Sequence, residues 1–174
     1  MRVYIDIETT GLSPSRHHVV EVGAVAYSDA WLEADRFESL VNPGEDVVAY
    51  WRGQTLPYND IEASALEAAR PAEVVALEFR AWLDALGPSE LYAFNSGFDS
   101  GFLAREPWNI NPAAWVGCVM IDATRLYGDG MRCISLKRAA FLCEVVGEQQ
   151  HRALADALMA AAVHRHVLCG GVPR

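Results

Sequence analysis

Lysine is almost missing from this 174-residue chain, because only Lys137 among its 14 basic residues is a lysine. With 23 acidic residues, the formal net charge is −9. Such a charge argues against the broad basic surface that usually neutralises the phosphates of a nucleic acid. The argument weakens if several carboxylates gather in one site and hold divalent cations, since bound cations reverse the local field. The charge therefore predicts weak, short-range binding to any polyanion.

Long hydrophobic runs and paired cysteines are also lacking. No apolar stretch approaches the ~20 residues that span a bilayer. An acid already interrupts the first apolar run, within residues 1–6, which does not suit a secretory signal peptide. The cysteines form no C-x-x-C pair, so we expect them to be reduced core residues rather than disulfide bridges: Cys118, Cys133, Cys143 and Cys169. We therefore expect a cytoplasmic protein without membrane contact.

No internal repeat, low-complexity tract or charged linker divides the chain, so its length and 52% hydrophobic content predict one folded domain. Closely spaced strands come first and strands alternating with helices follow, with a long loop from 42 to about 59. Expected strands cover 2–8, 19–27, 31–41, 91–94 and 116–121. Expected helices cover 71–86, a segment beginning near 98, 135–146 and 152–168. This order predicts an α/β domain with a mixed sheet covered by helices.

Two acids stand two positions apart in the first expected strand. Asp6 and Glu8 therefore point to one face of it, while Val3, Ile5 and Ile7 point to the other. Carboxylates on an apolar strand are costly unless they are exposed, paired or bound to a metal ion. A solvated edge strand explains the pair equally well. The spacing favours metal, because one strand can aim both carboxylates at the same hard cation.

Three further polar residues follow later in the chain. Asp99 lies where a short strand gives way to a helix, an edge at which α/β sheets place their sites, although the helix dipole alone could account for it. Asp156 shares the small, apolar face of the last helix with Ala160 and Val163. It needs a partner there unless the dipole satisfies it. His151 is expected on the loop just before that helix, where a histidine is more often solvated than catalytic. The other histidines are expected to be solvated: His17, His18, His164 and His166.

Together, three segments resemble the motifs of the DEDDh exonucleases, which are proofreading-type and RNA-trimming enzymes. Asp6–Gly11 resembles the first motif, Asn95–Asp99 the second and His151–Asp156 the third. Val19–Val25 is also similar to the second strand of that family. The motifs stand in the family's order and span residues 6–156, so the joint signal is far more specific than any one of them.

The resemblance implies a ribonuclease H-like fold, a mixed five-stranded sheet flanked by helices, in a single exonuclease domain over residues 1–174. It implies that two Mg²⁺ or Mn²⁺ ions bind to Asp6, Glu8, Asp99 and Asp156. It implies that His151 deprotonates the water that attacks single-stranded DNA or RNA at a free 3′ end. It also implies contacts to the terminal nucleotide from Thr10, Gly11 and Leu12, with Asn95 ordering the site.

The chemistry agrees with this assignment. Two divalent ions about 3.5–4 Å apart clamp the attacking and leaving oxygens of a phosphodiester. Four carboxylates suit hard, oxygen-preferring cations rather than zinc. A histidine titrates near neutrality, so it can accept a proton from the attacking water.

The sequence departs from the family in places. Arg152 stands where the tyrosine-containing sister family has its tyrosine, so the histidine branch fits better. Phe94 replaces a frequent histidine, which we expect to change packing rather than chemistry. The segment 51–63 matches poorly, so no substrate contact is assigned there. The chain ends soon after the last expected helix, so we expect a stand-alone enzyme or one whose polymerase or self-association contacts lie on the domain itself.

Two alternatives remain open. Asp6–Thr10 also resembles the D-x-D-x-T motif of haloacid dehalogenase-like phosphatases, although Glu8 replaces the second aspartate and His151 and Asp99 stay unexplained. Turnover of a phosphomonoester with oligonucleotides left intact would favour it. A binding module of the same fold that lost the reaction would instead bind an oligonucleotide tightly without cleaving it.

Overall fold

A mixed sheet of six strands, in the order β4-β3-β2-β1-β5-β6, forms the centre of the computed structural model, which describes residues 1–54, 56, 59–147 and 151–170. The first three strands form an antiparallel meander, whereas β5 on β1, β6 on β5 and β4 on β3 are parallel. The strands are β1 (Arg2–Thr9), β2 (Val19–Tyr27), β3 (Glu33–Asn42), β4 (Arg70–Pro71), β5 (Glu90–Ala93) and β6 (Trp115–Cys118). The predicted mixed α/β fold is confirmed.

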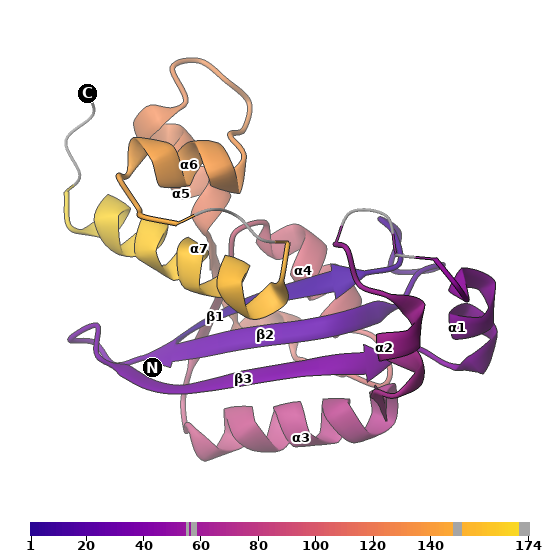
Figure 1. Cartoon of the computed structure of the whole chain (residues 1–174). Helices are drawn as coiled ribbons and strands as arrows, with labels where there is room; N and C mark the ends of the chain where they lie inside the picture. The colour runs from indigo at the N-terminus through magenta and orange to yellow at the C-terminus, as the bar shows by residue number, and fades with distance from the viewer. Residues whose placement is uncertain (55, 57–58, 148–150, 171–174) are drawn as a thin grey trace.

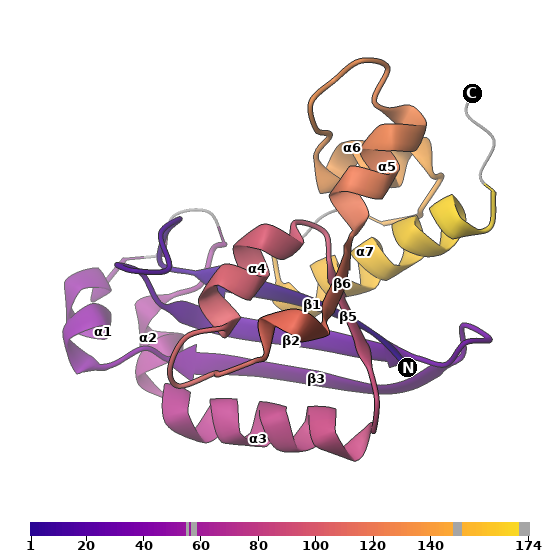
Figure 2. The same ribbon diagram turned by 180° about the vertical axis from the view of Figure 1, so that it is seen from behind.

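Helices cover both faces of this sheet (Figures 1 and 2). They are α1 (Glu45–Trp51), α2 (Ala63–Glu67), α3 (Ala72–Ala85), α4 (Ser96–Leu103), α5 (Val119–Tyr127), α6 (Leu136–Leu142) and α7 (Ala153–Leu168), with one 3₁₀ turn at Pro112–Ala114. Alternation along β1 explains the two layers. Val3, Ile5 and Ile7 enter a core with residues of α3 and α4, whereas Tyr4 points to the opposite core under α5, α6 and α7.

The last helix lies unusually close to the sheet. A Cβ atom on Gly23 of β2 would lie 2.1 Å from the backbone nitrogen of Leu154, so only glycine leaves room for the start of α7 there. Along α7, Asp156, Ala160 and Val163 are buried on the sheet side, as their spacing predicts. This close contact brings the first turn of α7 over β1 and β2.

Several predicted elements need correction. The sheet has six strands rather than five, because the two-residue β4 pairs with the end of β3. The expected strand 116–121 ends at Cys118, and its apolar second half is the first turn of α5. The region from 42 to about 59 contains α1, and the expected helix 135–146 is the shorter α6. The prediction of a solvated His164 is wrong: it is 2% exposed, and its Nδ1 lies 2.8 Å from the Tyr4 hydroxyl.

Among the described residues, no helix combines the length and the hydropathy that crossing a lipid bilayer would require. All four cysteines have free thiols, as predicted, but the expectation that they lie in the core is wrong for two of them: Cys143 is buried and Cys118 half-buried, whereas Cys133 and Cys169 are exposed.

Candidate active site

Strand β1 carries two acids on the face that α7 covers. Asp6 lies opposite Gly23 in the antiparallel register with β2, and Glu8 lies opposite Glu21. Both share the face of Tyr4, because alternate residues of a strand point the same way. The glycine opposite Asp6 is the one that lets α7 approach. Both acids therefore lie beneath the first turn of that helix.

Asp99 reaches the same place from the parallel half of the sheet. It lies in the first turn of α4, directly after β5, and is only 3% exposed. Its carboxyl accepts hydrogen bonds from the backbone of Asp99 itself and of Ile7 on β1. Asn95 begins the helix, but its side chain is exposed and makes no capping hydrogen bond. The bond from Ile7 ties α4 to the strand between Asp6 and Glu8.

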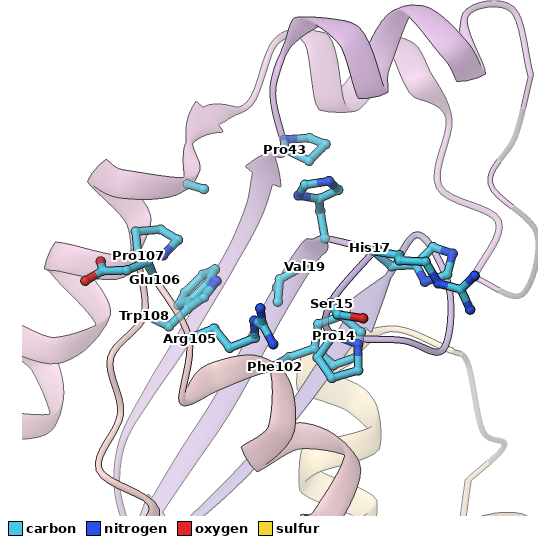
Figure 3. Close-up of a pocket in the computed structure, with 13 residues that line it drawn as sticks. Pro14, Ser15, His17, Val19, Pro43, Phe102, Arg105, Glu106, Pro107 and Trp108 are labelled. Carbon is cyan, nitrogen blue, oxygen red and sulfur yellow. The ribbon is translucent and has the colours of Figure 1, made fainter.

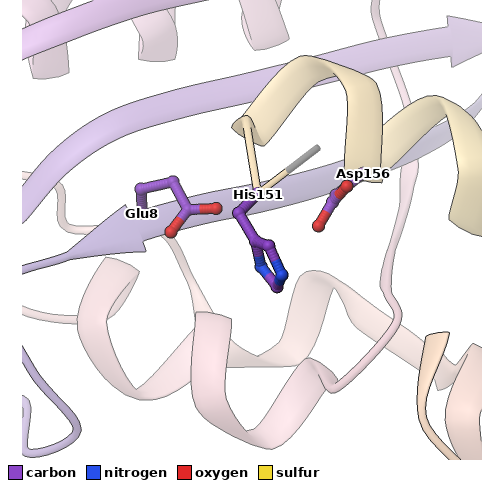
Figure 4. A group of neighbouring side chains, drawn as sticks. All are labelled: Glu8, His151 and Asp156. Atoms are coloured by element: carbon purple, nitrogen blue, oxygen red, sulfur yellow. The ribbon is translucent and has the colours of Figure 1, made fainter. Parts of the chain in front are cut away.

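The start of α7 completes the cluster. Asp156 lies in the first helical turn and is 4% exposed, whereas His151 precedes the helix and is exposed. One ligand atom from each of Glu8, His151 and Asp156 lies within 4.8 Å of the other two. Figure 4 shows the imidazole ring between the two carboxylates. The structure thus brings together residues from the first and third sequence motifs.

The carboxylates affect one another's protonation. Burial raises the pKa of Asp6 well above its usual value, and the charges of Asp99, Glu8 and Asp156 raise it further. Burial likewise raises the pKa of Glu8 to about 8 and that of Asp99 to about 8. Four acids close enough to repel one another need either protons or a cation at neutral pH.

This donor set fits divalent metal ions. Carboxylate oxygens are the ligands that Mg²⁺ and Mn²⁺ prefer, and the acids come from three separate elements that converge on one place. The charge of Glu8 acts on Arg152, but the guanidinium of Arg152 already pairs with Glu21. A bound cation would relieve the repulsion that the raised pKa values express.

Asn59 is a site residue that the sequence did not reveal. It is 1% exposed, and its side chain hydrogen bonds to Glu8, which counteracts part of the rise in the pKa of that acid. Its Nδ2 also donates to the backbone oxygen of Thr9 over 3.4 Å, and its Oδ1 accepts from Ile61 over 3.4 Å. The segment 51–63, to which no role was assigned, therefore supports the end of β1.

Glu21 on β2 is a second residue that the sequence did not reveal. Its carboxylate is fully buried and accepts from Nε of Arg152 over 3.0 Å and from the backbone N–H of Ala153 over 3.0 Å. The acid thus binds the first amide of α7 and the side chain just before it. His151 directly precedes Arg152, so this contact fixes the position at which the imidazole enters the site.

The turn after β1 presents the residues expected to touch a nucleotide. The Thr10 N–H donates to the His18 oxygen over 2.9 Å, and the His18 N–H donates to the Thr10 hydroxyl over 3.0 Å. The His17 ring packs so closely on Gly11 that a Cβ atom there would lie 2.5 Å from it. Leu12 is 77% exposed, so its side chain is available to a ligand.

Comparison with known proteins gives the family. The exonuclease family model RNase_T matches residues 3–164. The chain is 30% identical over 171 residues to the PolC-type DNA polymerase III of Thermotoga petrophila, covering 92% of this chain and 11% of that protein. It is 27% identical over 172 residues to the 3'-5' exonuclease DinG of Bacillus subtilis, covering 95% of this chain and 17% of that protein.

Solved structures share the fold. A full-length 3'-exonuclease superposes with a TM-score of 0.74 at 19% identity, covering 99% of this chain and 62% of that one. Exonuclease I of E. coli in complex with a dT13 oligonucleotide gives 0.67 at 14% identity, covering 96% of this chain and 40% of that one. These neighbours confirm the predicted ribonuclease H-like architecture.

This chain belongs to the RNase_T exonuclease family. Membership decides against the phosphatase alternative. The chain spans about a tenth of the length of its polymerase relatives.

Proposed function

We propose that this protein is a 3′–5′ exonuclease that removes nucleoside monophosphates from single-stranded DNA or RNA, with residues 1–174 as one exonuclease domain. The observation that carries the proposal is the convergence of β1, α4 and α7, which brings four acids and His151 to one edge of the sheet. The 3′–5′ exonuclease among the relatives and the 3'-exonuclease among the solved structures support the direction.

Asp6, Glu8, Asp99 and Asp156 would hold two Mg²⁺ or Mn²⁺ ions. When bound, such ions stabilise the charge on the attacking and leaving oxygens of the phosphodiester. The protein's own part is to place the carboxylates, and the buried Asn59 amide holds Glu8 in position for this.

His151 acts as the general base. As the water oxygen bonds to phosphorus, one proton of that water passes to the imidazole. The bond between phosphorus and the 3′ oxygen of the shortened strand breaks, and that oxygen takes up a proton from solvent to become the new 3′ hydroxyl. The released nucleotide keeps the phosphate at its 5′ position. Because the His151 side chain is exposed, it can return the proton to solvent between turnovers.

The terminal nucleotide lies against Thr10, Gly11 and the exposed Leu12, and Asn95 helps to order the site. The polymerase relatives, and the thymidine strand bound to E. coli exonuclease I, favour DNA as the substrate. Either strand type has the phosphodiester that the site requires.

A cleavage ladder tests the proposal. DNA and RNA of the same sequence, labelled at the 5′ end, are incubated with Mg²⁺, Mn²⁺ or a chelator. We expect a metal-dependent ladder that shortens from the 3′ end, with DNA shortened faster. Asp6→Ala should abolish it, whereas Asp84→Ala, which removes an exposed acid from α3, should not.

Two results would overturn the proposal. Cleavage by Asp6→Ala at the wild-type rate would remove the metal role of the carboxylates. Binding of the oligonucleotide without cleavage in either metal would instead identify a binding module of the same fold.

A further inference from the structure

A loop beside the candidate active site separates two hollows. Residues 13–18 connect β1 to β2, and Arg16, His17 and His18 line both hollows. The first hollow, about 280 Å³, also contains Arg105 and Trp108 (Figure 3). The second, about 430 Å³, is also lined by α1 and by Thr10. We call this loop and its two hollows the 13–18 track.

The arginines of this track differ from most others in the protein. Among the described residues, six arginines form ion pairs with carboxylates: Arg2, Arg36, Arg52, Arg70, Arg125 and Arg152. Among the described arginines that form none, Arg16 and Arg105 are exposed and line the first hollow together. In a protein with a formal net charge of −9, two guanidinium groups without carboxylate partners are available to another anion.

The acids of the track do not neutralise these arginines. In Figure 3 the carboxylate of Glu106 points away from the first hollow, whereas the guanidinium of Arg105 points into it. The second hollow has a single acid, Asp46, which is exposed in the first turn of α1. A stretch of positive charge therefore lies on a protein whose overall charge is negative.

An exposed aromatic side chain adjoins this positive stretch. Tyr50 on α1 is 74% exposed and lines the second hollow. Its ring meets that of Trp51 edge-on, with ring centroids 5.0 Å apart and planes at 87°, which orients it. Cationic side chains with exposed aromatic rings bind single strands without sequence preference, because every base has a face to stack on.

The track continues directly from the candidate active site. Thr10, which lines the second hollow, is two residues beyond Glu8, so their Cα atoms are about 7 Å apart along the strand. The mutual hydrogen bonds of Thr10 and His18 join the loop to the end of β1. A strand whose 3′ end reaches Glu8 would pass this loop next.

We propose that the 13–18 track binds the substrate strand behind its 3′ end, with Arg16 and Arg105 contacting phosphates and Tyr50 stacking on a base. This proposal rests on the proposed function, which brings a 3′ end to the carboxylates. It explains how an acidic protein binds a polyanion: two arginines without a carboxylate partner lie where the strand passes.

The first test measures binding without cleavage. A fluorescent thymidine strand of about twelve nucleotides, within the range that single-strand sites cover, is titrated in chelator at several salt concentrations. Arg16→Ala combined with Arg105→Ala should weaken binding ~10-fold or more and reduce the salt slope by roughly 1.4, since each phosphate contact on a single strand contributes about 0.7. Arg36→Ala is the control. It removes one positive charge near the first residues of β3, at the end of that strand away from the track.

A second test uses the aromatic side chain. Tyr50→Ala should weaken binding of the same strand ~10-fold, and Tyr50→Phe should restore it, because stacking needs the ring and not the hydroxyl. If the double arginine variant and Tyr50→Ala both bind like Arg36→Ala, the track does not hold the strand.

Cleavage separates this proposal from the proposed function. The ratio of kcat/KM for the long strand to that for a dinucleotide should fall ~10-fold in the double arginine variant, because a dinucleotide is too short to extend from the carboxylates past Thr10 to the two arginines. An unchanged ratio in an active enzyme would overturn the track and leave the exonuclease proposal standing. Loss of binding in the variants, with no cleavage by the wild type in either metal, would leave the track and overturn the exonuclease proposal.

Discussion

His151 has a backbone conformation that few residues other than glycine adopt. Its φ angle is 51°, and this places the imidazole between Glu8 and Asp156 rather than along the axis of α7. Unfavourable backbone conformations of this kind persist where the surrounding structure enforces them, and they concentrate at functional sites. Here the buried Glu21, through Arg152 and Ala153, enforces the position of the chain just after the histidine.

Replacing the imidazole tests whether it serves as the general base. We expect His151→Ala to lower kcat ~10²-fold or more, because the variant loses the imidazole proposed to accept the proton of the attacking water. Single-turnover cleavage of the labelled strand in Mg²⁺ measures this rate. His166→Ala, at the other end of α7, is the matched control and should cleave normally. Turnover by His151→Ala within a few-fold of wild type would remove the assigned role.

At this scale the sequence predicted some site residues and not others. The acids and His151 could be recognised from local sequence, because they lie two residues apart in one strand or close to the start of a helix. Their roles as ligands and base remain predictions. Glu21 and Asn59 could not be predicted, because each acts through a partner far along the chain. Arg152 is 131 residues from Glu21, and Thr9 is 50 residues from Asn59. A single ion pair or a lone amide leaves no periodic signal in the sequence.

Among the elements, the contact of α7 with β2 decides the geometry of the site. Asp156 and His151 both depend on where the first turn of α7 lies, and that turn lies over Gly23. A new Cβ atom at this position would meet backbone atoms, which cannot rotate away as a side chain can. The helix itself would have to move.

We therefore expect Gly23→Ala to destabilise the fold by roughly 1–3 kcal/mol, in the range for overpacked cores, and to weaken Mg²⁺ binding by displacing Asp156. Urea unfolding and a Mg²⁺ titration measure the two effects. Gly101→Ala in α4 is the control, because its Cβ would meet only Pro14, at 3.6 Å. That substitution should be neutral or slightly stabilising in a helix. Equal stability of the two variants would show that α7 is not fixed by this contact.

The predictions of secondary structure succeeded where periodicity was long. The alternating residues of β1 and the helical spacing of α3 and α7 extend over many positions, so those elements were predicted close to their observed bounds. The apolar run at Val119–Ile121 suits a strand or a buried helix equally, and the structure has a helix there. The two-residue β4 is too short to leave any pattern.

For the molecule as a whole, the carboxylate cluster links stability to pH. The pKa values of Glu8 and Asp99 are about 8 in the folded, metal-free protein, well above the values of about 4 in an unfolded chain, and that of Asp6 is also raised. Between these pH values the folded state binds more protons than the unfolded state. The resulting stability is fully present below about pH 4 and is lost as the pH rises through about 8.

Divalent ions should cancel this loss, because they replace the protons as the groups that offset carboxylate repulsion. We expect the free energy of unfolding in chelator to fall between about pH 4 and pH 8 and to level off above that, and to fall much less in excess Mg²⁺, which also adds its own binding free energy. Asp99→Asn, which removes one of the titrating groups, should flatten the decline in chelator. Urea unfolding across this pH range measures all three curves. If chelator and Mg²⁺ gave parallel curves, the acids would not form a metal site, since a cation that binds there must compete with the protons.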